Sequence, residues 1–195
     1  MNIYLLDRNE EMINAWVRVF QFEPDVEIYH DDFKHFMDTH PEIDGIVSPA
    51  NSFGLMDGGY DKAIIDYLGE NAQTHVLNML DIYFTGYQVV GTAAAIPFGK
   101  YRLIHTPTMR TPESIIDDRV IFDCMLSCLK MAENCKVKNL VIPAFGGCTG
   151  KVNKKAIAEY MHFAYKVFKN PHTETMNWGY ANHIGKTLKG ISKGV

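Results

Sequence analysis

Short apolar runs alternate along the chain with longer stretches in which apolar residues recur every three or four positions. The runs are typical of buried strands and the longer stretches of amphipathic helices. Strands are expected at 2–6, 26–29, 45–50, 87–96, 102–106 and 139–145, and helices at 10–20, 33–38, 60–68, 70–83, 111–134 and 154–169. Such alternation predicts a three-layer α/β/α sandwich with a mixed, largely parallel central sheet.

Several polar residues mark where these helices begin. Asn9 and Asn153 precede apolar-periodic stretches and can accept hydrogen bonds from first-turn N–H groups. Thr111 followed by Pro112 has the pattern of a helix start, which places the beginning of the fifth expected helix at 111. The segment 172–195 shows no clear periodicity, so we predict a domain over 1–171 and a C-terminal tail over 172–195 that packs on it.

Composition and charge exclude several classes of protein. The chain has 195 residues, 47% of them hydrophobic, and a formal net charge of −4. This acidic balance argues against non-specific nucleic-acid binding, which depends on many Lys and Arg contacts to phosphate. No apolar run approaches the roughly 20 residues of a membrane span, and the N-terminus has no signal-peptide pattern. Four cysteines without a CxxC pair predict reduced thiols and a cytoplasmic location, which would be the host cytoplasm if the protein is phage-encoded.

Two glycine-containing loops stand between a predicted strand and a predicted helix. The first passes Asn51, Gly58 and Gly59 before the helix at 60–68, and the second runs from Gly146 to Gly150. In parallel sheets ligands bind beyond the carboxyl ends of the strands, and backbone N–H groups at helix starts favour anions. Two such loops can hold two parts of one phosphate-bearing ligand. The eight histidines show no paired spacing, so we expect neither a metal nor another cofactor.

The first loop, IVSPANSFGLMDGGYDKAI, resembles the ligand loop of macro domains, which runs roughly VNAAN…GGG…D…AI. In that register Asn51, Gly58, Gly59 and Asp61 occupy the family's positions, whereas Asp57 stands where many members have glycine. The second loop, PAFGGCTGKVNKKAIAEYM, is similar to the family's diphosphate loop. Cys148 replaces the usual glycine in the middle of that loop.

Two further stretches carry the same resemblance. VEIYHDDF is similar to a strand end that places Asp32 and Phe33 beside the adenine, although Asp31 is an alternative for the same role. The segment that contains HTPTM, after the paired strands, most resembles macro domains related to phage-tail-type proteins. Together the similar stretches cover about 26–168.

The resemblance implies a protein that binds ADP-ribose, or an ADP-ribosylated substrate, and hydrolyses it. In related hydrolases the Asn orients the far ribose, and the Asp, or a phosphate oxygen of the substrate, positions and activates water. The resemblance thus implies catalytic roles for Asn51 and Asp61. The bond broken would be a linkage at the ribose anomeric carbon, or the phosphate ester of ADP-ribose 1″-phosphate. The implied ligand-binding residues are Asp32, Phe33, Ala50, Asn51, Gly58, Gly59, Tyr60, Gly146, Gly147, Cys148, Thr149, Gly150 and Val152.

Other hypotheses remain open from the sequence. The domain can be a non-catalytic ADP-ribose reader, or a structural or interaction module of phage origin. Asn51 can cap a turn, Asp61 can be an ordinary first-turn helix acid, and Asp32 can cap the helix that follows it. His105 lies on a buried-type strand and fits a core histidine, and Cys148 fits a small loop residue. The segment 172–195 can instead cover the ligand cleft as a lid.

Overall fold

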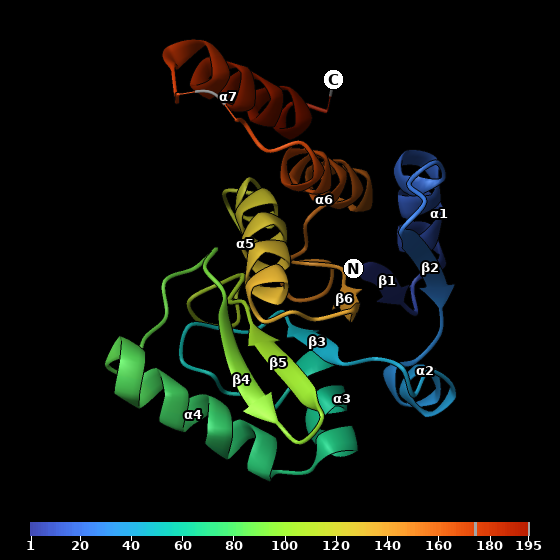
Figure 1. Ribbon diagram of the computed structural model, residues 1–195, viewed down its shortest axis with the longest axis vertical. Coiled ribbons are helices and arrows are strands. Elements are labelled where there is room, and N and C mark those ends of the chain that lie inside the picture. Colours follow the sequence, from blue (N-terminus) through green and yellow to red (C-terminus); the bar gives the residue numbers. More distant parts are fainter. Residues whose placement is uncertain (174, 195) are drawn as a thin grey trace.

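A single six-stranded sheet forms the centre of the computed structural model, which describes residues 1–173 and 175–194 (Figure 1). The strand order is β2-β1-β6-β3-β5-β4, and every neighbouring pair is parallel except the antiparallel pair β4 and β5. The strands are β1 Asn2–Asp7, β2 Val26–His30, β3 Gly45–Ser48, β4 Ala94–Phe98, β5 Tyr101–His105 and β6 Asn139–Pro143. The sheet is therefore mixed and largely parallel, as the sequence predicts.

Helices cover both faces of this sheet and complete the three layers (Figure 1). The helices are α1 Glu10–Phe20, α2 Phe33–Thr39, α3 Gly59–Leu68, α4 Asn71–Phe84, α5 Val120–Asn134, α6 Lys154–Lys169 and α7 Trp178–Ser192. Apolar residues of α1, α5 and α6 form one core cluster with the sheet, and those of α2, α3 and α4 form a second cluster on its other face.

Strand register decides which side chains meet which helix layer. Val47 and Ile104, on the neighbouring strands β3 and β5, belong to the α1, α5 and α6 cluster, whereas Ile46 belongs to the other one. Successive side chains of a strand point to opposite faces. Ser48 and His105, which are paired in register, therefore point toward the layer that contains α3.

The predicted helix caps are present. Asn9 Oδ1 accepts a hydrogen bond from the Met12 N–H at 2.9 Å, and Asn153 Oδ1 accepts from the first-turn N–H groups of α6. Asp32 likewise caps α2, because its Oδ1 accepts from the His35 N–H at 3.0 Å. Each cap satisfies a donor that has no partner within its own helix.

The expected helix start at 111 is wrong, because α5 begins at Val120. Residues 111–119 instead form an irregular loop that is tied to the glycine loop after β6. The Ile115 N–H donates to the Gly150 carbonyl oxygen at 2.9 Å, and the Ile115 side chain lies against Gly146. A contact with a segment distant in sequence therefore overrides the Thr-Pro signal.

The strand expected at 87–96 is shorter and begins later, at Ala94. Gln88 is buried, and its backbone N–H donates to the Ser52 carbonyl oxygen at 2.9 Å. Gly91 then turns the chain with a φ of 83°. The first half of the apolar run serves to pack against the loop after β3 and does not join the sheet.

The tail contains a helix that the sequence pattern did not indicate. Ile184, Leu188 and Ile191 of α7 pack against the core cluster that includes α6, and the Tyr160 hydroxyl donates to the Leu188 carbonyl oxygen at 3.3 Å. Ser192 and Tyr160 both donate to Asp118, at 3.0 and 2.9 Å. As Figure 1 shows, α7 forms an outer layer over α6. The apolar pattern of this helix is weak, because its sequence contains three glycines and its packed residues are only half-buried.

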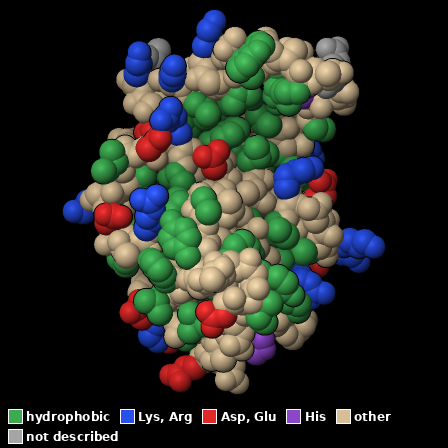
Figure 2. Space-filling view, turned by 90° about the vertical axis from the view of Figure 1, so that its left-hand side faces the viewer, with side chains coloured by type: hydrophobic (Ala, Val, Ile, Leu, Met, Phe, Trp, Pro, Cys, Tyr) green, Lys and Arg blue, Asp and Glu red, His purple; other side chains and the backbone are tan. Residues whose placement is uncertain are grey.

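Charged side chains of both signs are interspersed on the face of the molecule that Figure 2 shows, with hydrophobic side chains between them.

The cysteines are all free thiols, and Cys124 and Cys128 are buried on α5. Within the described residues, no helix has both the length and the apolar character that crossing a membrane requires.

We expect Leu188→Ala to lower the free energy of unfolding by about 1–2 kcal/mol, because it removes half-buried apolar contacts between α7 and the core. Lys186→Ala, at an exposed position of the same helix, is the matched control and should change stability by less than about 0.5 kcal/mol. Urea unfolding of both variants measures this. Equal effects would contradict the packing of α7 on the domain.

Candidate functional site

One pocket lies beyond the carboxyl ends of the neighbouring parallel strands β5, β3 and β6. Its walls come from the three segments that follow these strands and from the first turn of α3. The lining residues are Pro49, Ala50, Asn51, Leu55, Asp57, Gly58, Gly59, Tyr60, Asp61, Thr108, Met109, Pro112, Ala144, Gly146, Gly147, Cys148, Thr149 and Gly150. Both glycine loops singled out by the sequence thus face the same space.

Asn51 organises the loop that follows β3. Its Nδ2 donates to the Leu55 carbonyl oxygen at 2.6 Å, and its Oδ1 accepts from the Phe53 N–H at 3.1 Å. These bonds close a turn with the asparagine side chain, as Asn does in many loops. The turn-cap interpretation of Asn51 is thus correct for its side chain, although the residue also lines the pocket.

The same loop is fixed to α4 and to the segment after β5. The Met56 N–H donates to Gln73 Oε1 of α4 at 2.8 Å, and the Ser52 N–H donates to the Met109 carbonyl oxygen at 3.0 Å. Gly54 has a φ of 71°, and a Cβ there would lie 2.7 Å from the Leu80 side chain. Glycine is needed at this position because the loop approaches α4 closely.

The second glycine loop is packed against the irregular segment 111–119. Gly146 has a φ of 69°, and a Cβ there would lie 2.8 Å from Ile115 Cδ1. At Gly150 a Cβ would lie 2.8 Å from the Gly146 carbonyl oxygen. The Lys154 ammonium binds the Gly147 carbonyl oxygen from the first turn of α6. Cys148 and Thr149, at the tip of the loop, are exposed and line the pocket.

A buried carboxyl group occupies the floor of the pocket. Asp61, in the first turn of α3, is 8% exposed, and its Oδ1 accepts a hydrogen bond from the Ser48 hydroxyl at 2.7 Å. Burial raises the pKa of Asp61 to about 7; the Ser48 hydrogen bond opposes this rise and the charge of Asp57 adds to it. A carboxyl group with this pKa exchanges its proton near neutral pH, as a general base must.

His105 lies beneath the loop after β3 as a buried core residue. Its Nδ1 is 2.8 Å from Gln88 Oε1, and Gln88 Nε2 donates to the His105 and Thr92 carbonyl oxygens. Since the amide nitrogen faces acceptors, Gln88 Oε1 must accept, so Nδ1 carries the proton. Burial lowers the pKa of His105 to about 4, and the Asn51 backbone opposes this shift in part. The histidine is therefore neutral and holds Gln88 in place.

Three predicted ligand-binding residues do not line the pocket. Asp32 is exposed and caps α2, and the alternative Asp31 is 2.5 Å from His35 Nδ1. Phe33 is buried, with its ring edge-to-face on Tyr60 at a centroid distance of 5.1 Å. Val152 is a core residue whose N–H donates to the Gly146 carbonyl oxygen at 3.1 Å. Phe33 thus supports a pocket residue, and Val152 supports the second loop.

The remaining predicted residues come together at the pocket from loops that are distant in sequence. They are Ala50, Asn51, Gly58, Gly59, Tyr60, Asp61, Gly146, Gly147, Cys148, Thr149 and Gly150. A Cβ added at Gly58 or Gly59 would meet no atom within 4 Å, so the first turn of α3 is open toward the pocket. The N–H groups of a helix's first turn have no partner within the helix and favour anions.

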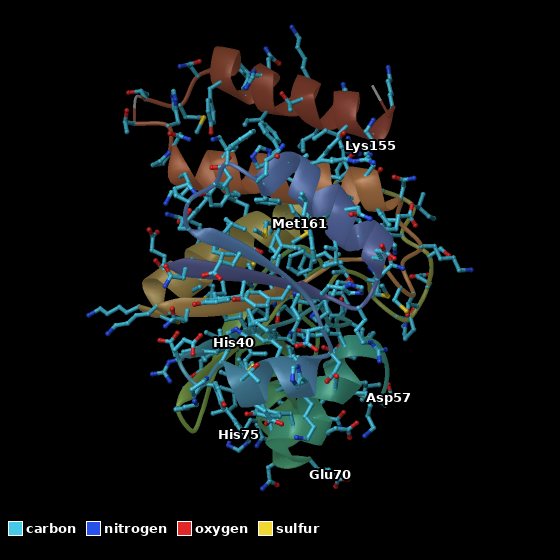
Figure 3. The ribbon with its side chains drawn as sticks, turned by 90° about the vertical axis from the view of Figure 1, so that its right-hand side faces the viewer. His40, Asp57, Glu70, His75, Lys155 and Met161 are labelled. Carbon is cyan, nitrogen blue, oxygen red and sulfur yellow. The ribbon has the colours of Figure 1, made fainter. Side chains whose placement is uncertain are left out.

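The charged groups of the pocket are acidic. Asp57 and Asp61 line it, and no Lys or Arg is found among the described residues that do. Figure 3 shows Asp57 at the outer edge of the molecule beside α3, apart from Glu70 and His75. An anion in this pocket would therefore be held by backbone N–H groups and by the dipole of α3.

Sequence reasoning missed Ser48 and the far wall of the pocket. Ser48 follows two buried apolar residues of β3 and precedes a proline, so a polar residue there is a signal that it bonds a buried partner. Thr108, Met109 and Pro112 line the pocket because the chain after β5 continues beside the chain after β3. Of these three residues, only Pro112 falls in the helix expected at 111–134, and Thr108 and Met109 precede it.

Comparison with known proteins identifies the family and the fold. A family model described as Macro domain matches residues 47–161 of this chain. The chain belongs to the macro domain family. The match begins in β3 and ends in α6, and it contains both glycine loops. An uncharacterised protein of Aquifex aeolicus is 32% identical over 123 residues, which are 63% of this chain and 73% of that protein.

Solved macro domains share the fold. The macrodomain of Mycobacterium tuberculosis DarG superposes with a TM-score of 0.56 at 13% identity, covering 64% of this chain and 82% of that one. The Oceanobacillus iheyensis macrodomain with ADP gives a TM-score of 0.55 at 20% identity, covering 66% and 72%. A variant of the same macrodomain with ADPR gives 0.55 at 17% identity, covering 65% and 72%.

We expect Asp61→Asn to stabilise this macro domain increasingly as the pH rises. Between the ordinary carboxyl pKa of 3.8 and the folded value of about 7, the folded protein holds a proton that the unfolded chain releases. Its stability therefore falls with rising pH, by roughly 1.4 kcal/mol per pH unit for this one group. Asparagine has no such proton, so its advantage should grow by about 2–3 kcal/mol between pH 5 and pH 8.

Urea unfolding of both proteins at several pH values measures this difference. Asp66→Asn, on the exposed side of the same helix, is the control and should give a nearly pH-independent difference. A constant difference for Asp61→Asn would show that the Asp61 carboxyl is ionised throughout this range.

Proposed function

We propose that this macro domain binds ADP-ribose, or an ADP-ribosylated molecule, and hydrolyses the bond at the distal ribose. The observation that carries the proposal is the pocket in which two glycine loops, Asn51 and a buried Asp61 with a pKa near neutrality meet. The family membership and solved macro domains titled with ADP and with ADPR support it.

The parts of such a ligand suit different parts of the pocket. The diphosphate fits between the open first turn of α3 and the loop from Gly146 to Gly150, where backbone N–H groups stand in for cationic side chains. The distal ribose fits beside Asn51 and Asp61. The adenine would extend past Tyr60 toward Phe33 and Asp32, and an exposed carboxylate at Asp32 could accept a hydrogen bond from the adenine amino group.

The proposed reaction is attack of water on the anomeric carbon of the distal ribose. Asp61, ionised at and above neutral pH, accepts a proton from the water as its oxygen bonds to that carbon. The bond to the leaving group breaks with its electron pair, and the leaving group then takes up a proton. Holding the water and the ribose in place provides much of the rate, because the oriented pair reacts as one unit.

A non-catalytic reader of ADP-ribose is the second candidate, and the Asn51 side chain favours it. Both of its polar atoms are engaged within the loop, at 2.6 Å from Nδ2 to the Leu55 carbonyl oxygen and 3.1 Å from the Phe53 N–H to Oδ1. A ribose would then be oriented by Asn51 only through the second Nδ2 hydrogen, because Oδ1 already accepts from the Phe53 and Leu55 N–H groups. Such a pocket can bind without fast turnover.

We also propose that this protein is located in the cytoplasm. The cysteines are all free thiols, and Cys148 is exposed in the ligand loop. Exposed free thiols persist in a reducing environment, so we place the protein in the cytoplasm.

Calorimetry is expected to show micromolar binding of ADP-ribose, weaker binding of ADP and far weaker binding of AMP. Each smaller ligand loses contacts, first to the distal ribose site and then to one phosphate site. The control is Asp66→Asn, which should bind like the parent protein because Asp66 lies outside the pocket. Equal affinities for the three ligands would contradict a pocket that recognises the distal ribose.

Asp61→Ala is expected to reduce turnover of ADP-ribosylated substrate by at least about 100-fold, since a positioned general base contributes 10²–10⁴-fold. ADP-ribose affinity should fall by less than about tenfold, because the loops remain. Release of ADP-ribose from modified protein and nucleic acid, and of phosphate from ADP-ribose 1″-phosphate, measures the rate. Undetectable turnover by the parent protein with intact binding would favour the reader, and equal turnover by both proteins would remove Asp61 from the mechanism.

A further inference from the structure

Ser48 makes a hydrogen bond to the Asp61 carboxyl group, although it does not line the pocket. It is the last residue of β3, its side chain is fully buried, and its hydroxyl donates to Asp61 Oδ1 at 2.7 Å. Thirteen positions separate the two residues, with the whole first loop between them. The contact thus joins the end of the strand to the first turn of α3.

The strand holds Ser48 itself in a fixed position. Its carbonyl oxygen accepts from the Thr106 N–H at 2.9 Å, and its Cα is in register with that of His105 on β5. The neighbouring residues Ile46 and Val47 are buried in the two core clusters. A serine so placed can hold its hydroxyl, and through it the carboxyl oxygen, with little freedom to move.

Among the described groups near Asp61, Ser48 is the one that donates a hydrogen bond to its carboxyl group. Asp57 in the loop is an acid of the same sign, and the Tyr60 hydroxyl is neutral because burial raises its pKa. His105, from the neighbouring strand, is also neutral because burial lowers its pKa to about 4. Among these described neighbours, Ser48 alone donates a hydrogen bond to the carboxyl group.

We propose that Ser48 is a positioning residue that anchors Asp61 Oδ1, so that the second oxygen, Oδ2, faces the pocket and meets the water or the distal ribose. This inference rests on the proposed function for the role of Oδ2, whereas the anchor itself is a property of the ligand-free protein. A hydroxyl can donate to the carboxylate and accept from the neutral acid, so it holds Asp61 in both protonation states.

Removing the hydroxyl has two consequences that can be separated. The carboxylate loses a hydrogen bond that favours its charged form, so the pKa of Asp61 should rise above about 7. The carboxyl group also becomes free to rotate, so Oδ2 no longer keeps one direction. A purely structural role in the core would change the stability of the fold without moving the titration of Asp61.

The experiment compares four substitutions in the full chain. Ser48→Ala removes the hydroxyl, and Ser48→Thr retains it. Ser48→Val has the shape of threonine without the hydroxyl, so the Thr and Val pair decides the matter even if the Ala variant fails to fold. Ser52→Ala is the matched control, because the Ser52 hydroxyl is also buried but has no hydrogen-bond partner.

The first readout is the titration of the Asp61 carboxyl carbon by NMR in the ligand-free protein. We expect its pKa to rise by about one unit or more in Ser48→Ala and Ser48→Val, and to stay within a few tenths of a unit in Ser48→Thr and Ser52→Ala. An unchanged titration in Ser48→Val, or an equal rise in Ser52→Ala, would overturn the anchor.

The second readout is the pH dependence of kcat for ADP-ribosyl hydrolysis. The acid limb should shift upward by the same amount in Ser48→Val, with kcat at pH 7 reduced about tenfold, KM nearly unchanged, and recovery in Ser48→Thr. A shifted titration with unchanged kcat would overturn the positioning role while the proposed function stands. A shifted titration in a parent protein that neither binds nor hydrolyses ADP-ribose would overturn the proposed function, and the anchor alone would stand.

Discussion

The parallel alignment of β5, β3 and β6 is the constraint on which the site depends. Because these strands are neighbours and run in one direction, the segments that follow them emerge at one edge of the sheet. Hydrogen bonds from the Thr106 and Thr108 N–H groups to the Ser48 and Ala50 carbonyl oxygens continue the pairing beyond β3 and β5. Residues nearly a hundred positions apart therefore line one pocket. The first turn of α3 follows the first glycine loop and lines the same space, so its N–H groups are available to an anion there.

Within the pocket, the cost of burying Asp61 decides the charge that a bound anion would meet. A buried carboxyl group resists ionisation, and at a pKa of about 7 it is neutral in a large share of molecules near neutral pH. A neutral Asp61 repels a diphosphate less than an ionised one would, which matters because Asp57 is already acidic. The same burial brings the proton exchange of Asp61 close to neutral pH, where the proposed base chemistry would need it.

The sequence allowed the layers, most elements and both loops to be predicted, since strong periodicity and capping residues such as Asn9 and Asn153 are local signals. It failed where distant contacts decide the local structure. The segment 111–119 stays irregular because Ile115 binds the Gly150 loop, and 87–93 leaves the sheet because Gln88 binds Ser52 and His105. The helix α7 buries only parts of its residues against α6, so its apolar stripe is faint. The hydrogen bond between Ser48 and Asp61 depends on how the end of β3 lies against the first turn of α3. No local sequence pattern contains that arrangement.

The first loop is held in place by contacts within the protein itself, which bears on the choice between reader and hydrolase. Asn51 closes it from within, Gln73 holds Met56, and Gly54 lies against α4. A preformed loop loses little entropy when it binds, so affinity can come from backbone groups alone. Catalysis has a further requirement, because a side chain of fixed orientation must hold a water against the distal ribose. In this pocket the Asn51 side chain already bonds the Leu55 carbonyl oxygen and the Phe53 N–H. In the proposed hydrolase that task would therefore belong to Asp61, with the Ser48 hydroxyl behind it.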